Sequence, residues 1–197
     1  MGTNFKTAIL VLAAGASSRM NEIKQVLPYK DSTLLGNALK MAKMSKSAQV
    51  FCVLGANKDE IQQKVDFLDI EIIENKEWND GLGKSIAVGV ATIQKNSEYN
   101  SILVMLGDQP FITSRYLDKM ISKFNENQSP VIATNYSGKP GVPALFPHKN
   151  FSELIKISGD SGAKSILKNH ANIIKLEAEN TFDVDSPEDY KKLCSEV

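Results

Sequence analysis

Short apolar runs alternate along the chain with segments in which apolar residues recur every three or four positions. A short apolar run predicts a buried strand, and the longer spacing predicts a helix with one buried face. The predicted strands of the first half are Thr7 to Leu12, Gln49 to Leu54, Glu71 to Glu74 and Ser101 to Leu106. The predicted helices are Thr33 to Met44, Lys58 to Phe67, Ser85 to Ile93 and Ser114 to Phe124. This alternation indicates an α/β fold on a mostly parallel sheet.

The second half of the chain is less regular. A hairpin is predicted where turn-forming residues separate two apolar runs, Val131 to Thr134 and Val142 to Phe146. The segments predicted after it are helices Phe151 to Ile157 and Ser161 to Asn169, a strand Ile173 to Leu176 and an extended stretch Phe182 to Asp185. A last helix starts at Ser186, because Pro187 suits its first position and Asp189 completes a capping box. No repeat or linker divides the chain, so we predict one domain over residues 1–197.

Composition narrows the classes of function. The chain has 197 residues, 42% of them hydrophobic, which is enough for the core of one domain. Lys and Arg number 23, as do Asp and Glu, so no basic surface for nucleic acid is expected. No apolar run is as long as a membrane span, and we predict a cytoplasmic protein without membrane contact. Cys52 and Cys194 form no metal or redox motif, and His148 and His170 have no partner at metal-ligand spacing.

The first predicted strand has an alternative interpretation. Lys6 followed by the apolar run Ala8 to Ala14 has the outline of a short signal peptide. We favour the strand, because the run has the length of a buried strand and its removal would delete the loop that follows. N-terminal sequencing of the expressed protein distinguishes the two.

The loop after this strand is the first candidate for chemistry. Residues Leu12 to Met20 are mostly small, so backbone N–H groups can approach a polyphosphate, and Arg19 and Lys24 supply positive charge. The pattern indicates a nucleotide-binding enzyme. It is not a dinucleotide-binding fingerprint, since Ser17 and Ser18 stand where further glycines are needed. The alternative is a tight strand-to-helix turn whose small residues serve packing.

A second glycine-containing loop, Asp80 to Ser85, ends in Gly-Lys-Ser like a P-loop. A P-loop needs a glycine five residues before Gly83, and Trp78 stands there instead. Gly81 and Gly83 nevertheless open a helix whose N–H groups can contact a base or ribose. The alternatives are a flexible helix start without a ligand and, for Trp78, a packing role.

Acidic residues follow two of the predicted strands. Asp108 comes just after Ser101 to Leu106, and ligands of open α/β sheets bind outside the carboxyl ends of the strands. Asp108 is therefore a candidate Mg²⁺ ligand, the alternative being a turn residue bonded to its own backbone. Asp183 and Asp185 offer a second carboxylate, and alternation along a strand turns only one of them toward the metal. We favour Asp185, which adjoins the last helix.

In order along the chain, these motifs resemble the MobA-like nucleotidyltransferase superfamily, and more closely its molybdenum cofactor cytidylyltransferase branch. The blocks that carry the resemblance are Leu12-Ala13-Ala14-Gly15-x-Ser17-x-Arg19-Met20, Lys24-Gln25-x-Leu27-Pro28, Gly81-Leu82-Gly83-x-Ser85, Asp108-Gln109-Pro110, Gly141-x-Pro143-x-Leu145-Phe146, Gly159-Asp160-x-Gly162-Ala163 and Asp183-Val184-Asp185-Ser186-Pro187-Glu188-Asp189-Tyr190. They cover nearly the whole chain. The resemblance implies a three-layer α/β/α Rossmann-like fold of the nucleotide-diphospho-sugar transferase type.

The resemblance also implies a Mg²⁺-dependent transfer of CMP from CTP to the terminal phosphate of molybdopterin, with release of pyrophosphate. Such a displacement needs positioning and charge neutralisation. The implied catalytic residues are Arg19, Lys24 and Asp108, and the implied metal ligands are Asp108 and Asp185, less favourably Asp183. The implied nucleotide-binding residues are Leu12, Ala13, Ala14, Gly15, Ser17, Ser18, Arg19, Lys24, Gly81, Gly83 and Ser85. The acceptor is expected at the hairpin region, about residues 131–170, with contacts from Gln109, Pro143 and Asp160.

Base and acceptor depend on finer features. Ala14 before Gly15 is similar to the cytidylyltransferase form and favours CTP, since the guanylyltransferase branch more often has two glycines in this loop. Three positions depart from the family pattern, Asn21 for Gly, Lys84 for a small residue and Lys164 for Arg. Asn tolerates the positive φ of Gly, Lys84 could alter base preference or bind phosphate, and Lys at 164 loses bidentate recognition of the acceptor.

Two other hypotheses remain. The same chemistry could use a sugar phosphate as acceptor, or GTP as donor. A hypothesis of another class is a non-catalytic module that delivers molybdenum cofactor to a molybdenum hydroxylase, which is also the candidate protein partner. The presence of both cations and both carboxylates favours catalysis, because a carrier does not need metal ligands.

Overall fold

The computed structural model describes residues 5–20, 22–96 and 98–195. They form a seven-stranded sheet in the order β5-β4-β1-β6-β8-β7-β9. The strands are β1 (Thr7–Ala13), β4 (Gln49–Leu54), β5 (Ile70–Glu74), β6 (Ser101–Leu106), β7 (Val131–Tyr136), β8 (Lys139–Pro147) and β9 (Ile173–Leu176). β1 pairs in parallel with β4 and β6. Within this seven-stranded sheet of the described residues, β8 alone runs antiparallel to the other strands, which confirms a mostly parallel sheet.

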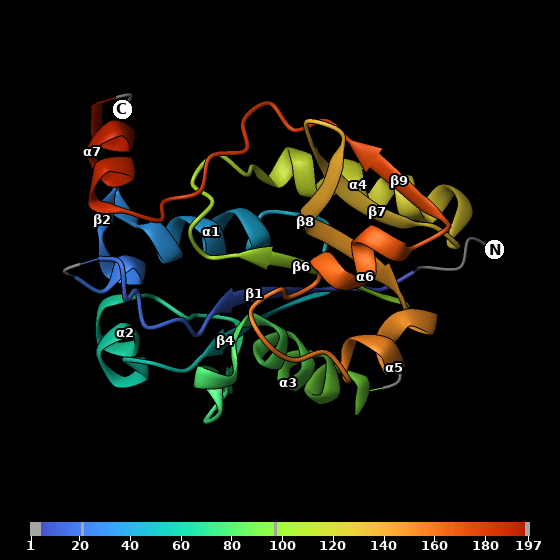
Figure 1. The fold of residues 1–197 in the computed structure, drawn as a ribbon, viewed down its shortest axis with the longest axis horizontal. Helices are drawn as coiled ribbons and strands as arrows, with labels where there is room; N and C mark the ends of the chain where they lie inside the picture. Colours follow the sequence, from blue (N-terminus) through green and yellow to red (C-terminus); the bar gives the residue numbers. More distant parts are fainter. Residues whose placement is uncertain (1–4, 21, 97, 196–197) are drawn as a thin grey trace.

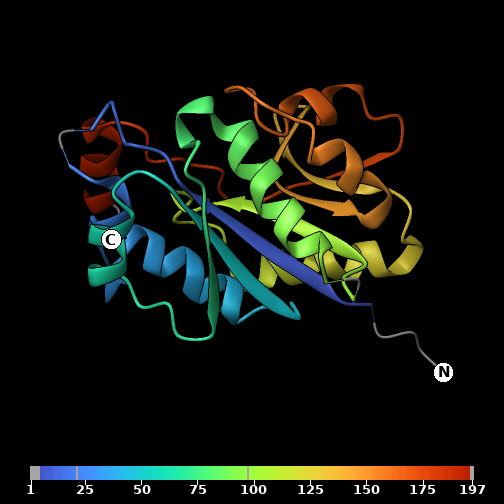
Figure 2. The ribbon, with the colours of Figure 1, turned by 90° about the horizontal axis from the view of Figure 1, so that it is seen from below.

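Helices cover both faces of this sheet and produce the three expected layers (Figure 1). One face packs against α1 (Leu34–Lys43), α2 (Lys58–Lys64) and α4 (Ser114–Asn127). The other packs against α3 (Leu82–Gln94), α5 (Phe151–Leu154) and α6 (Lys164–Asn169), and Figure 2 shows α3 lying across the strands. Successive residues of β1 alternate between the two apolar clusters. The strand therefore reads as a continuous apolar run, because both of its faces are buried.

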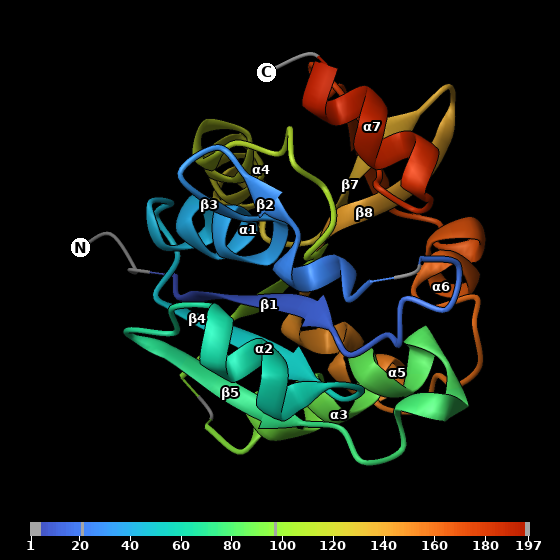
Figure 3. The same cartoon turned by 90° about the vertical axis from the view of Figure 1, so that its left-hand side faces the viewer.

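A smaller unit lies beside the sheet. β2 (Pro28–Tyr29) and β3 (Ser32–Thr33) form a short hairpin, and α7 (Pro187–Ser195) packs near it (Figure 3). The apolar residues that join them are Leu27, Tyr29, Leu34, Val184 and Leu193. The predicted capping box is confirmed, since Asp189 N–H donates to Ser186 Oγ at 3.2 Å and Ser186 N–H donates to the Asp189 carboxylate at 2.8 Å. α7 thus anchors the acidic segment that precedes it.

Some predicted elements have different limits. The hairpin of β7 and β8 is confirmed but longer, because its turn consists only of Ser137 and Gly138, both with positive φ. The extended stretch Phe182 to Asp185 joins no sheet, so the strand assumed for the alternation of its two carboxylates is wrong. None of the helices within the described ranges is both long enough and apolar enough to cross a membrane.

Candidate functional site

The loop after β1 is held from behind by a buried glutamine. Gln25 Nε2 donates to the carbonyl oxygens of Ala13 at 3.0 Å and Gly15 at 2.8 Å, and its Oε1 accepts from the Ser17 hydroxyl at 3.1 Å. Ser17 has a φ of 56°, which is uncommon for a residue other than glycine. This bracing leaves Gly15 and Ser18 exposed at the sheet edge. The sequence predicted no role for Gln25 beyond its place in the block Lys24-Gln25-x-Leu27-Pro28.

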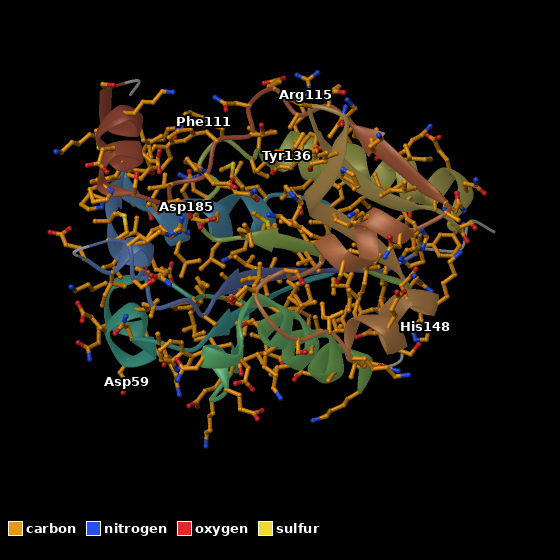
Figure 4. All side chains as sticks on the ribbon, in the orientation of Figure 1. Asp59, Phe111, Arg115, Tyr136, His148 and Asp185 are labelled. Atoms are coloured by element: carbon orange, nitrogen blue, oxygen red, sulfur yellow. The ribbon has the colours of Figure 1, made fainter. Side chains whose placement is uncertain are left out.

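Two cations and two carboxylates meet in front of this loop. Lys24 Nζ lies 2.5 Å from Asp108 Oδ2 and 3.3 Å from Asp185 Oδ1, and the Arg19 guanidinium lies 3.5 Å from the same Asp185 oxygen. The Lys24 and Asp108 side chains are mostly buried, whereas Arg19 is 73% exposed. Figure 4 shows Asp185 between α7 and the sheet, far from His148 at the other end of the molecule. The structure therefore brings together the four charged residues predicted to act together.

Backbone hydrogen bonds explain how distant segments reach this point. β1 and β6 are parallel neighbours, so their carboxyl ends share one edge, and Gly107 N–H donates to Leu12 O at 3.0 Å. Val184 N–H donates to the Asp108 carbonyl at 3.1 Å, which attaches the C-terminal acidic segment to the same edge. The pairing follows from the parallel sheet, because the carboxyl ends of its strands form one ligand-binding edge.

Asp183 belongs to the same cluster as Asp185. Its Oδ1 accepts from Gln109 Nε2 at 2.9 Å. Burial raises the pKa of Asp183 to about 6, the charges of Asp108 and Asp185 add to the rise, and the hydrogen bond from Gln109 opposes it. We assumed from the sequence that Asp183 and Asp185 alternate along a strand. That assumption was wrong, because the segment is not a strand.

The cluster suits a hard divalent cation that arrives with phosphate. Within residues 5–20, 22–96 and 98–195, no three His, Cys, Asp or Glu side chains gather closely enough to hold a metal by themselves. Mg²⁺ usually takes one or two carboxylates and completes its shell with phosphate oxygens and water. Asp108 Oδ1 is buried and has no hydrogen-bond partner in the described part of the chain. Since an unpaired buried oxygen destabilises a fold, its retention fits a ligand role.

The second glycine-containing loop has a different environment. Gly83 N–H donates to Gly159 O at 2.8 Å, and Gly159 N–H donates to Asp80 O at 3.0 Å. A Cβ on Gly81 would lie 2.5 Å from the carbonyl carbon of Gly159, and one on Gly83 would lie 2.8 Å from the Ser158 carbonyl. Contact between this loop and a nucleotide stays a prediction. The structure accounts for both glycines by close approach of two backbone segments.

The remaining side chains of this loop are also engaged within the protein. Ser85 is buried, and its hydroxyl accepts from Asn75 Nδ2 at 3.0 Å. Trp78 packs over Gly55, where a Cβ would lie 2.6 Å from that of the tryptophan. The packing interpretation of Trp78 therefore agrees with the structure.

The three departures from the family pattern have separate outcomes. Lys84 Nζ pairs with Glu77 at 2.8 Å, so its charge is directed toward a neighbouring carboxylate. Lys164 is exposed at the start of α6. Asn21 lies outside the described residues.

The residues predicted to bind the acceptor occupy two places. Gln109 is only 2% exposed, and its Nε2 contacts Tyr136 and the Val142 carbonyl as well as Asp183. Pro143 follows Val142 in β8 and is buried. Asp160 is exposed, and its Oδ1 lies near Gly81 of the second loop. No sequence signal pointed to Tyr136, whose part in this arrangement arises from the hairpin geometry.

The other candidate residues lie apart from the cluster. His148 is exposed and its ring packs 4.7 Å from that of Phe151, while His170 faces Asn150 at 3.2 Å. Both cysteines are free thiols, one buried in β4 and one exposed in α7. None of them contacts the charged residues described above in any hydrogen bond or ion pair of the described chain.

Comparison with known proteins identifies the family of this chain. The family model of the MobA-like NTP transferase domain matches residues 9–173. The chain is 26% identical over 184 residues to a molybdenum cofactor cytidylyltransferase of Escherichia coli K12, covering 92% of each protein. It is 27% identical over 195 residues to nicotine blue oxidoreductase of Paenarthrobacter nicotinovorans, covering 93% of this chain and 94% of that protein.

Solved structures share the fold. Rv0371c of Mycobacterium tuberculosis H37Rv superposes with a TM-score of 0.85 at 26% identity, covering 98% of this chain and 100% of that one. A complex of the same protein with manganese gives a TM-score of 0.83 at 25% identity, with the same coverage. The family match extends over the loop after β1, the second glycine-containing loop and Asp108. By sequence and by fold, this chain belongs to the family of MobA-like NTP transferase domains.

Proposed function

We propose that this nucleotidyltransferase transfers CMP from CTP to the terminal phosphate of molybdopterin and releases pyrophosphate. Membership of the family establishes the general class of enzyme, and the proposal adds the base and the acceptor. The observation that carries it is the meeting of Arg19 and Lys24 with Asp108 and Asp185 where β1 and β6 end. Such a set can neutralise a triphosphate and hold a divalent cation.

Two features support the finer assignment. Ala14 before Gly15 matches the cytidylyltransferase form of the loop, and the E. coli relative is named for cytidylyl transfer to the molybdenum cofactor. Overall identity does not choose the reaction, since a relative with an oxidoreductase name is equally similar. The charged residues therefore favour phosphate chemistry over oxidoreduction, while Ala14 and the E. coli relative support the base and the acceptor.

In the proposed mechanism Lys24 changes partners. In the free protein its ammonium neutralises Asp108 and Asp185. When CTP binds, the phosphates attract Lys24 and Arg19, and the two carboxylates become available to hold Mg²⁺. Asp108 and Asp185 would hold this ion, which would supply positive charge to the phosphate oxygens. The exposed backbone at Gly15 lets N–H groups approach the phosphates.

The bond changes need no nucleophile from the protein. An oxygen of the acceptor's terminal phosphate forms a bond to the α-phosphorus of CTP. The bond between that phosphorus and the oxygen bridging to the β-phosphate breaks, and pyrophosphate leaves with the electron pair. Catalysis then consists of holding the reacting groups in line and stabilising charge.

The test is pyrophosphate release with CTP, GTP, ATP or UTP, in the presence of Mg²⁺ and either molybdopterin or a panel of sugar phosphates. We expect release with CTP and molybdopterin, and no release when EDTA removes the metal. Asp108→Asn, which keeps the shape of the side chain, should remove turnover without unfolding the protein.

Other outcomes select the remaining hypotheses. Release only with GTP, or only with a sugar phosphate, would contradict the proposed donor or acceptor. Binding of molybdopterin without any release, together with transfer of the cofactor to an apo molybdenum hydroxylase, would identify a delivery module instead.

A further inference from the structure

A chain of hydrogen bonds joins the β7–β8 hairpin to the acidic segment before α7. Gln109 Nε2 lies at its centre, 3.0 Å from the Tyr136 hydroxyl, 2.9 Å from Asp183 Oδ1 and 3.2 Å from the Val142 carbonyl. The Tyr136 hydroxyl donates to the same carbonyl at 2.5 Å. Because that hydroxyl uses its hydrogen there, it accepts from Gln109. The direction of these hydrogen bonds is thus defined, with Gln109 donating both to Tyr136 and to Asp183.

The orientation of the Gln109 amide follows from its surroundings. A carboxylate and a backbone carbonyl accept hydrogen bonds and cannot donate them, so the amide nitrogen must face Asp183 and Val142. Gln109 Oε1 is consequently left buried without a partner in the described parts of the chain. An arrangement that leaves an amide oxygen unpaired is unfavourable for stability alone. This unfavourable arrangement indicates that the link to Asp183 has a function.

Tyr136 is itself fixed by packing. A Cβ on Gly141, in the opposite strand of the hairpin, would lie 2.7 Å from Tyr136 Cε2, so the glycine makes room for the ring. Burial raises the pKa of Tyr136 well above its usual value, and the hydroxyl stays protonated as the donor that the chain requires. Figure 4 shows Tyr136 and Asp185 on the same side of β1. The hairpin therefore offers Gln109 a rigid anchor.

The link gains importance when substrate binds. In the free protein, Lys24 ties Asp185 to Asp108. Under the proposed mechanism Lys24 leaves this position for the phosphates, and the segment that carries Asp185 loses that tie. The Gln109–Asp183 hydrogen bond and the backbone bond from Val184 then remain to hold the segment at Asp108, together with the apolar packing of the Val184 side chain.

We propose that Gln109 and Tyr136 are positioning residues that hold Asp183, and with it the segment bearing Asp185, against Asp108 for metal binding. This rests on the proposed function only in that Asp108 and Asp185 hold the metal. Gln109 then acts through Asp183 rather than through contact with the acceptor. Asp183 is in turn an anchor for the segment, not a ligand.

The test measures Mn²⁺ binding to the whole protein in the presence of inorganic pyrophosphate, by the EPR signal of free Mn²⁺. Residues that orient metal ligands typically change metal affinity by about 10- to 100-fold. We expect Gln109→Met to weaken Mn²⁺ binding at least about tenfold on that basis, and Tyr136→Phe to weaken it less. Circular dichroism checks that each variant is folded, and Tyr136→Phe provides the test if Gln109→Met does not fold.

Two variants at Asp183 separate anchoring from ligation. Asp183→Asn keeps an oxygen that can accept from Gln109, so an anchor should retain Mn²⁺ affinity, whereas Asp183→Ala should lose it as Gln109→Met does. Equal losses in both variants would make Asp183 a ligand and overturn the proposal. Wild-type affinity in folded Gln109→Met would overturn it as well.

A second buried tyrosine provides the matched control. The Tyr116 hydroxyl bonds to Thr134 Oγ1 at 3.0 Å and to the Leu176 carbonyl at 3.2 Å, away from Asp183. Tyr116→Phe should therefore lower stability but leave Mn²⁺ affinity unchanged. If Tyr116→Phe weakens Mn²⁺ binding as much as Tyr136→Phe does, general destabilisation of the fold would explain both losses. The assay contains neither a nucleobase nor an acceptor. Its result can therefore be interpreted even if the protein does not turn over CTP or molybdopterin. Absence of Mn²⁺ binding in the wild type would contradict the metal site itself.

Discussion

The loop after β1 and the loop before α3 both contain small residues and glycines, yet their glycines have opposite surroundings. A Cβ on Gly15 would meet no atom of the described residues within 4 Å. A Cβ on Gly81 or Gly83 would meet the backbone of residues 158–159 at 2.5 to 2.8 Å. The first loop faces open space beside four charged side chains, and the second faces another part of the same chain.

This difference separates two reasons for a glycine. One keeps backbone N–H groups accessible to an external ligand, and the other lets two segments of the protein approach each other. The nearby cations differ in the same way, since Lys24 lies with Asp108 and Asp185 whereas Lys84 pairs with Glu77 at the surface. Under the proposed function we therefore expect phosphate at the first loop, on the basis of the contacts of each loop rather than its glycine content.

The largest expected effect compares the two lysines. Lys24→Met should lower kcat/KM for pyrophosphate release by about 10²- to 10³-fold, the range typical of one positioned charge-stabilising group. Lys84→Met should change it less than about twofold, because an exposed ion pair contributes little. Steady-state kinetics of both variants checks this, and similar losses would place phosphate at both loops.

A smaller effect is expected on stability at the second loop. Gly81 has φ 89° and ψ 179°, a conformation nearly confined to glycine, and has no room for a Cβ. Gly81→Ala should lower the free energy of unfolding by about 3 kcal/mol, as strain and overlap add. Urea denaturation measures it.

Gly138→Ala is the matched control for this prediction. Gly138 has a similar φ of 90°, but a Cβ there would have no neighbour within 4 Å in the described chain. Gly138→Ala should therefore lower the free energy of unfolding by about 1 to 2 kcal/mol, through backbone strain alone. Equal losses in the two variants would remove close packing as the reason for Gly81.

A still smaller effect is expected from pH on the free energy of unfolding. It arises at Asp183, in the acidic segment that lies beside the first loop. The folded-state pKa of Asp183, about 6, lies above the ordinary value of 3.8. The fold therefore favours the protonated carboxyl, and this contribution is present below pH 4 and lost as the pH rises through 6. We expect the titration of Asp183 to lower the free energy of unfolding by about 2 kcal/mol between pH 4 and pH 6, after a discount for the partial exposure of its side chain.

Comparison of the wild type with Asp183→Asn isolates this contribution, because the other groups titrate in both proteins. Urea unfolding in EDTA at pH 4.5 and 7.5 should show a smaller decrease in the variant. An identical decrease in both proteins would contradict the raised pKa.

The parallel core could be predicted from the sequence, whereas its surroundings could not. β4 and β6 have the predicted bounds and β1 is one residue longer, because a strand buried on both faces is a plain apolar run. The β2–β3 hairpin was not predicted, since strands of two residues have no periodicity. The insertion of β8 between β6 and β7 depends on contacts between distant residues.

The same limit applies to the site. Asp108 and the loop after the first strand were predicted at one edge, because ligands of open α/β sheets bind outside the carboxyl ends of the strands. The role of Lys24 beside Asp108 was implied by the family resemblance. The strand assumed for Asp183 and Asp185 was wrong, because these residues join no sheet. The preference for Asp185 as the ligand stays a prediction. Gln25 and Tyr136 had no predicted role, since their hydrogen bonds arise only when the loop and the hairpin have folded.

CTP affinity and unfolding free energy, measured together for Gly15→Ala and Gly83→Ala, test most directly whether the two loops differ as described. Neither glycine has a φ in the left-handed region, so surroundings alone separate the variants. Gly15→Ala should keep its stability within about 0.5 kcal/mol, as an accessible surface change does, and bind CTP with Mg²⁺ more weakly. Gly83→Ala should lose about 2 kcal/mol through overlap and, while folded, bind CTP as the wild type does. Weaker CTP binding in Gly83→Ala, with wild-type binding in Gly15→Ala, would contradict the account.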